Sequence, residues 1–106
     1  MAHSTTPATK ENVTIDFGGI ERTGSLCHDD VNRLLLLETD EGPEHISVSL
    51  KAYGLTPRPG SVFIKDWSEH SGLTARLAAA GLVEPLRALV CGPFASPAYE
   101  VEVTLG

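Results

Sequence analysis

The chain has 106 residues, of which 42% are hydrophobic and 21% charged, and its 14 acidic and 8 basic side chains give a formal net charge of −6. This length allows one hydrophobic core, and the composition excludes the low hydrophobicity that keeps disordered chains from collapsing. The negative charge and the scattered basic residues argue against direct nucleic-acid binding, and no apolar run approaches the roughly 18 residues of a membrane-spanning helix.

The N-terminal segment, residues 1–11, is polar and has no periodicity, which predicts a flexible tail. It lacks the apolar run of a signal peptide, so we expect a cytoplasmic protein. Residues 12–106 show no repeat and no change of composition, and they are predicted to form a single domain. Cys27 and Cys91 form no CxxC pair; free thiols are the simpler interpretation, and a disulfide between them stays open.

Alternating apolar residues predict strands in the first half of this domain. Residues 13–17 alternate cleanly, the following Gly18-Gly19 pair predicts a turn, and residues 20–28 predict a returning strand. Residues 33–39 contain four consecutive leucines between turn signals, which is typical of a central strand covered on both faces.

Further strands are predicted along the rest of the chain. Residues 45–51 alternate and are expected to form a hairpin with the leucine strand. Residues 53–60 contain two prolines and two glycines and predict a long loop before a strand over residues 61–65. Strands are also expected over residues 86–91 and 99–105.

The main helix is predicted over residues 69–80. Ser68 is expected to cap its first turn, Glu69 complements the helix dipole, and Gly81 predicts a left-handed stop. Its apolar stripe consists of Leu73, Leu77 and Ala80. The fold class that follows is α+β, with an antiparallel sheet of about five to seven strands and this helix packed on it.

One segment resembles a known family. Residues 61–85 resemble a motif found in uncharacterised small proteins of bacterial phages, plasmids and other mobile elements, carried here by Val62, Ile64, Lys65, Asp66, Trp67, Ser68, Glu69, Gly72, Leu73, Leu77, Gly81, Val83 and Pro85. The chain departs from the family at Ser71, where an acidic residue would complete a capping box. The resemblance implies a mobile-element context, in which small acidic proteins such as anti-CRISPR and anti-restriction inhibitors block host enzymes or defence complexes.

Residues 65–70, with the sequence Lys-Asp-Trp-Ser-Glu-His, gather acid, base and hydroxyl groups just before the helix. One hypothesis is a small hydrolase or metal-dependent enzyme that uses Asp66, Glu69 and His70, with His28 as an optional further member. The alternative is that these residues cap the helix, with Trp67 packing as a hydrophobic staple, and display a contact surface. We favour the second interpretation because each residue has a local structural reason.

No cofactor or metal is expected. Cys27, His28, Asp29 and Asp30 could join His45 around a metal, but their spacing matches no established ligand pattern and the two aspartates are ordinary turn residues. The sequence also lacks the phosphate-binding, dinucleotide-binding, zinc-protease and CxxC motifs.

Acidic residues cluster around one predicted hairpin turn, and Glu100 and Glu102 alternate along the last strand. They predict an anionic surface that would attract a basic partner such as the nucleic-acid groove of a nuclease, although solubility alone is a sufficient reason for it. We therefore predict a non-enzymatic protein-binding domain with a contact surface made of Glu38, Asp40, Glu41, Glu44, Asp66, Trp67, Glu69 and His70. A further alternative is a homodimer formed through the last strand, if that strand lies at a sheet edge.

Overall fold

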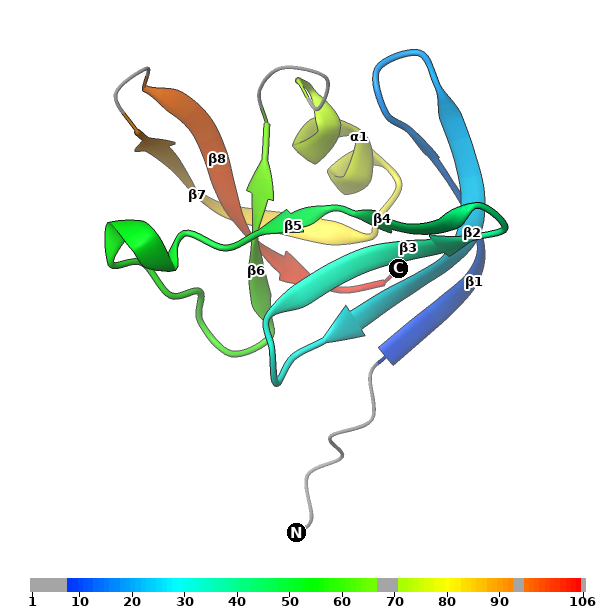
Figure 1. Cartoon of the computed structure of the whole chain (residues 1–106), viewed down its shortest axis with the longest axis horizontal. Helices are drawn as coiled ribbons and strands as arrows, with labels where there is room; N and C mark the ends of the chain where they lie inside the picture. The colour runs from blue at the N-terminus through cyan, green and yellow to red at the C-terminus, as the bar shows by residue number, and fades with distance from the viewer. Residues whose placement is uncertain (1–7, 67–70, 93–94, 106) are drawn as a thin grey trace, which may run out of the picture.

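The computed structural model describes residues 8–66, 71–92 and 95–105, which form two four-stranded antiparallel sheets and two short helices (Figure 1). The first sheet has the order β1-β2-β3-β4 and consists of Ala8–Asp16, Glu21–Asp29, Leu34–Thr39 and Gly42–His45. The second has the order β5-β6-β8-β7. It consists of β5 (Ser47–Val48), β6 (Ser61–Lys65), β8 (Ser96–Val103) and β7 (Val83–Cys91). The helices are η1 (Lys51–Tyr53) and α1 (Leu73–Ala79).

The antiparallel pairing and the single α-helix of these residues agree with the predicted α+β class. The expected single sheet of about five to seven strands is wrong, because the described residues form eight strands in two sheets. Neither helix in these ranges is long and apolar enough to cross a membrane.

The chain passes from the first sheet to the second at Ile46, which is fully buried. The Ile46 N–H donates to the carbonyl oxygen of Leu35 at 2.9 Å, and the Leu35 N–H donates to Ser47 Oγ at 2.8 Å. Ser47 then begins β5, which pairs with β6. The predicted hairpin strand over residues 45–51 is therefore divided, because the chain bends into the core in its middle.

The main core lies between the two sheets and α1, which contacts β1, β6 and β7 (Figure 1). Its fully buried members include Leu26, Leu35, Leu37, Val62, Ile64, Leu73 and Val101. In β3, Leu35 and Leu37 face this core, whereas Leu34 and Leu36 are only half-buried. The central position of β3 is confirmed, but its cover on the outer face is partial.

A second, smaller apolar cluster covers the opposite face of the second sheet. Phe63, Ala98 and Leu50 are its buried members, and Val48, Leu55 and Leu89 pack against them. Because Phe63 lies between Val62 and Ile64 on the same strand, β6 is buried on both faces. The segment between β5 and β6 folds over this cluster.

Helix α1 is shorter than the predicted range of 69–80. It begins after Gly72, which has a positive φ of 83°, and Ser68 and residues 69–70 lie outside the described ranges. The predicted stop is confirmed: Gly81 has φ 75°, and the Leu82 N–H donates to the Leu77 oxygen at 3.0 Å, as in a Schellman motif. Leu73 and Leu77 are buried as expected, but Ala80 is exposed.

Two strand positions differ from the expectations. Strand β1 already begins at Ala8, inside the segment predicted to be a tail, and pairs there with His28 of β2. Strand β8 lies between β6 and β7 and not at a sheet edge. Both of its sides are therefore already paired, so the condition for a homodimer through this strand, a position at a sheet edge, is not met.

Candidate functional site

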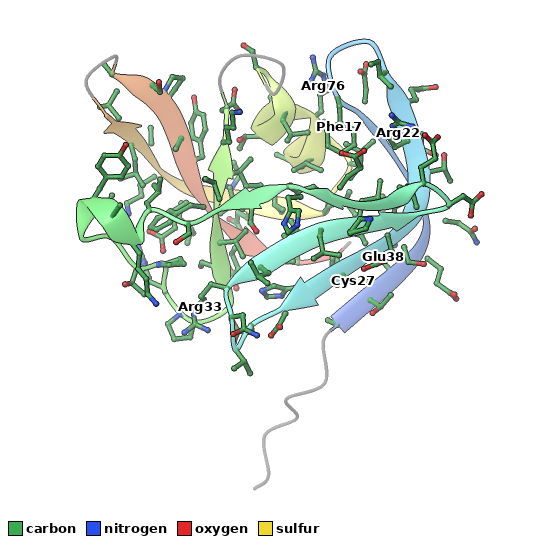
Figure 2. All side chains as sticks on the ribbon, in the orientation of Figure 1. Phe17, Arg22, Cys27, Arg33, Glu38 and Arg76 are labelled. Carbon is green, nitrogen blue, oxygen red and sulfur yellow. The ribbon has the colours of Figure 1, made fainter. Side chains whose placement is uncertain are left out.

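The predicted acidic cluster lies at the β3–β4 turn, at one end of the first sheet. Glu38 is exposed on the outer face of β3, opposite Pro43, and Asp40 and Glu41 are exposed in the turn itself. Glu44, on β4, is half-exposed. Figure 2 shows Glu38 and Arg22 at the end of the sheet where this turn lies. The structure therefore places these four predicted residues at one turn, but Glu38 lies on the outer face of the sheet and Glu44, opposite Leu37, on the inner face.

The β3–β4 turn is held in a defined shape by its own hydrogen bonds. Thr39 Oγ1 donates to the carbonyl oxygen of Gly42 at 2.7 Å and accepts the N–H of Glu41 at 3.1 Å. From β2, Arg22 Nη1 lies 2.8 Å from Glu41 Oε2, and Arg22 Nε lies 3.8 Å from Glu44 Oε1. Arg22 thus pairs with two of the four carboxylates, and Glu38 and Asp40 make no ion pair among the described residues, so the turn keeps a net negative charge.

Asp66 lies elsewhere, directly after β6 in the second sheet, and is almost completely buried. Its Oδ1 accepts the N–H of Gly72 at 2.7 Å, and its Oδ2 accepts the N–H of Thr74 at 2.9 Å. These are N–H groups at the start of α1, which have no partner within the helix. Among the described residues, Asp66 is therefore the side chain that satisfies these N–H groups at the start of α1, and the predicted cap Ser68 lies outside them.

The other predicted members of the helix junction, Trp67, Glu69 and His70, lie outside the described residues. Asp66 follows β6 in the second sheet, whereas the acidic turn joins β3 and β4 in the first sheet, so these predicted contact residues lie on different sheets. Its carboxylate holds backbone groups in place and is not displayed on the surface.

Glu100 was expected on an exposed acidic face, and that expectation is wrong. Its side chain is fully buried, and its carboxylate accepts the N–H of Arg58 at 2.9 Å and Nε of Arg87 at 2.5 Å. Burial alone would raise the pKa of Glu100, but these hydrogen bonds and the charges of the two arginines outweigh burial and hold the pKa below its usual value. Glu102 is exposed, as expected.

The residues around Cys27 do not converge on one point. Cys27 and His28 are neighbours on β2, so their side chains point to opposite faces of the sheet. His28 is 8% exposed, its Nε2 has no hydrogen-bond partner among the described residues, and Asp30 Oδ1 lies 3.8 Å away. His45 is exposed on β4. Within residues 8–66, 71–92 and 95–105, no three His, Cys, Asp or Glu side chains are grouped to hold a metal ion.

Comparisons of this chain with protein-family models, with curated proteins and with solved structures find no match. The functional argument therefore depends on the residues and geometry described above.

Proposed function

We propose that this chain is a non-enzymatic protein-binding domain whose β3–β4 turn binds a basic surface of a partner protein. The observation that carries this proposal is the exposure of Glu38, Asp40 and Glu41 at a turn that is fixed by hydrogen bonds, where Arg22 is the one cation that forms ion pairs among the described residues. A rigid turn binds at a lower entropic cost than a mobile one, because its side chains are already positioned.

Electrostatics supports the same choice of partner. The net charge of −6 surrounds the turn with a field of its own sign, which repels nucleic acid and attracts cationic surfaces. Such complementarity raises the association rate and makes it dependent on salt. A basic groove of a host nuclease or defence complex has the required charge. The resemblance of residues 61–85 to proteins of mobile elements makes an anti-CRISPR-like inhibitor the specific form of this proposal.

The alternative proposal, a hydrolase or metal-dependent enzyme at the helix junction, needs Asp66 as a reacting group. Its two oxygens already accept the N–H groups of Gly72 and Thr74 in a buried position. This structural role supports binding over catalysis through Asp66.

Matched double variants test the proposal in a bacterial lysate. Asp40→Asn with Glu41→Gln removes two charges from the turn, and Glu84→Gln with Glu102→Gln removes two exposed charges from β7 and β8. We expect the wild type and the second variant to retain a stoichiometric partner that salt elutes, and the first variant to lose it. Retention by both variants, or no stoichiometric partner in several bacterial hosts, would contradict the proposal.

A further inference from the structure

A second concave region lies away from the acidic turn. It is a hollow of about 320 Å³ where the β2–β3 turn meets the segment between β5 and β6. Phe63 and Leu50, which are almost fully buried, line its inner part, and the half-buried Val48 and Leu55 line its sides. This volume is at the lower end of the range of small-molecule sites, about 300–1,000 Å³.

The walls of the hollow are fixed before any ligand enters. On one side, Arg33 Nε donates to the carbonyl oxygen of Pro57 at 3.4 Å, and Asp30 Oδ1 accepts the N–H of Gly60 at 2.7 Å, which ties the β2–β3 turn to the opposite wall. On the other side, the Leu55 N–H donates to the Leu50 oxygen at 3.2 Å. Figure 2 shows Arg33 where the two walls meet.

The charge of the lining is opposite to that of the whole chain. Arg33 and Lys51 are its charged members, and neither Asp nor Glu is among the described residues that line it. Lys51 makes no ion pair with a carboxylate in the described ranges. Arg33 uses Nε for Pro57 and Nη1 for Asp30, and its Nη2 has no hydrogen-bond partner among those residues. Arg33 is ion-paired at 3.2 Å with Asp30, which does not line the hollow, so Lys51 is the lining cation without a carboxylate partner among the described residues. An apolar interior with this cation and the Nη2 group of Arg33 favours a ligand with an apolar part and one anionic group.

We propose that this hollow binds a small amphipathic carboxylate, with its apolar part against Phe63 and Leu50 and its carboxylate near Lys51 and Arg33. The site is independent of the proposed acidic contact surface, because no residue of the β3–β4 turn lines it. A ligand there would also contact both tied segments, and above its dissociation constant it would stabilise the folded chain by an amount that rises with the logarithm of its concentration.

Titrations followed by amide NMR shifts test this proposal with octanoate and octylammonium below their micellar ranges and octanol below its solubility limit. We expect saturable shifts with octanoate at residues 31–34, 48–51 and 55–57. We also expect Lys51→Glu and Val31→Glu to weaken octanoate binding about tenfold or more, because each places a carboxylate beside the anionic group. Val31 is 64% exposed, so the second substitution does not disturb the core.

Two controls make the same chemical changes elsewhere on the surface. Lys10→Glu reverses an exposed charge on β1, and Ile20→Glu places an acid at a residue that is 60% exposed. Both should leave octanoate affinity within about twofold of the wild type. The proposal is wrong if octylammonium binds as tightly as octanoate, or if the shifts map outside the hollow. It is also wrong if the Lys51 and Val31 variants bind like their controls, or if an acidic peptide binds there while octanoate does not.

Discussion

Glu100 and Arg87 lie opposite each other on β8 and β7, and the fully buried Glu100 carboxylate accepts a hydrogen bond from Arg87 Nε at 2.5 Å. The second oxygen of Glu100 accepts the N–H of Arg58, in the segment that covers the outer face of the same sheet. One buried charge therefore joins two strands to the segment that forms a wall of the hollow.

We predict that Glu100→Gln lowers the free energy of unfolding by roughly 1.5–3 kcal/mol, the usual contribution of a hydrogen bond to a charged group. The amide is neutral, and its NH2 group would face one of the two donors, the Arg58 N–H or Arg87 Nε, so that hydrogen bond is lost. Urea denaturation measures the change. The control is Glu102→Gln, which removes an exposed carboxylate from the same strand. Equal stability of the two variants would contradict this role of Glu100.

Asp66 gives a second prediction, because both of its oxygens hold the start of α1. Asp66→Ala should lower the free energy of unfolding by about 1–2 kcal/mol, the upper part of the range for loss of a helix cap, since the site is buried. Thermal unfolding measures the loss, with the exposed turn variant Asp40→Ala as the matched control. If Asp66→Ala unfolds at the wild-type temperature, the carboxylate does not stabilise the helix.

Local elements of this fold could be predicted from the sequence, but their arrangement could not. Alternation located β8 and the second half of β1, and Gly81 located the end of α1, because these signals depend on residues a few positions apart. The division into two sheets depends on distant pairing. Residues 45–51 alternate like one strand, and only the structure shows that Ile46 turns into the core between two different partners.

The candidate site shows the same difference between features set by neighbouring residues and features set by distant segments. The acidic turn could be predicted because exposed carboxylates next to Gly42 and Pro43 are a local pattern. The burial of Glu100 could not, because Glu100 alternates with Val101 like a solvent-facing residue and is covered by a segment far away in the sequence. The sequence contained one signal for a covered outer face of this sheet. Val62, Phe63 and Ile64 are apolar in succession, which is typical of a strand covered on both faces, and Phe63 pairs with Glu100.

Gly24 leads to a steric prediction. A Cβ atom at this position would overlap the carbonyl oxygen of Glu38, because β2 and β3 approach too closely there for any side chain on Gly24. We expect Gly24→Ala to lower the free energy of unfolding by about 1–3 kcal/mol, as overpacking does. Gly54→Ala is the control, because its Cβ would meet open space and only its positive φ of 73° would cause strain, roughly 1 kcal/mol. Urea denaturation of both variants would contradict the steric argument if Gly24→Ala were the more stable.

The buried imidazole of His28 predicts a loss of stability in weak acid. Burial lowers the pKa of His28 below its ordinary value of 6.5, and the opposing charges of Asp30 and Asp29 do not reverse this. The unfolded chain then binds a proton at a pH where the folded chain does not. The contribution of His28 is therefore complete above pH 6.5, decreases as the pH falls below 6.5, and is constant again below the folded-state pKa. Urea denaturation from pH 7.5 to 5 should show a smaller decrease for His28→Gln than for the wild type or for His45→Gln, which replaces an exposed histidine. Parallel curves for all three proteins would show that His28 does not carry the effect.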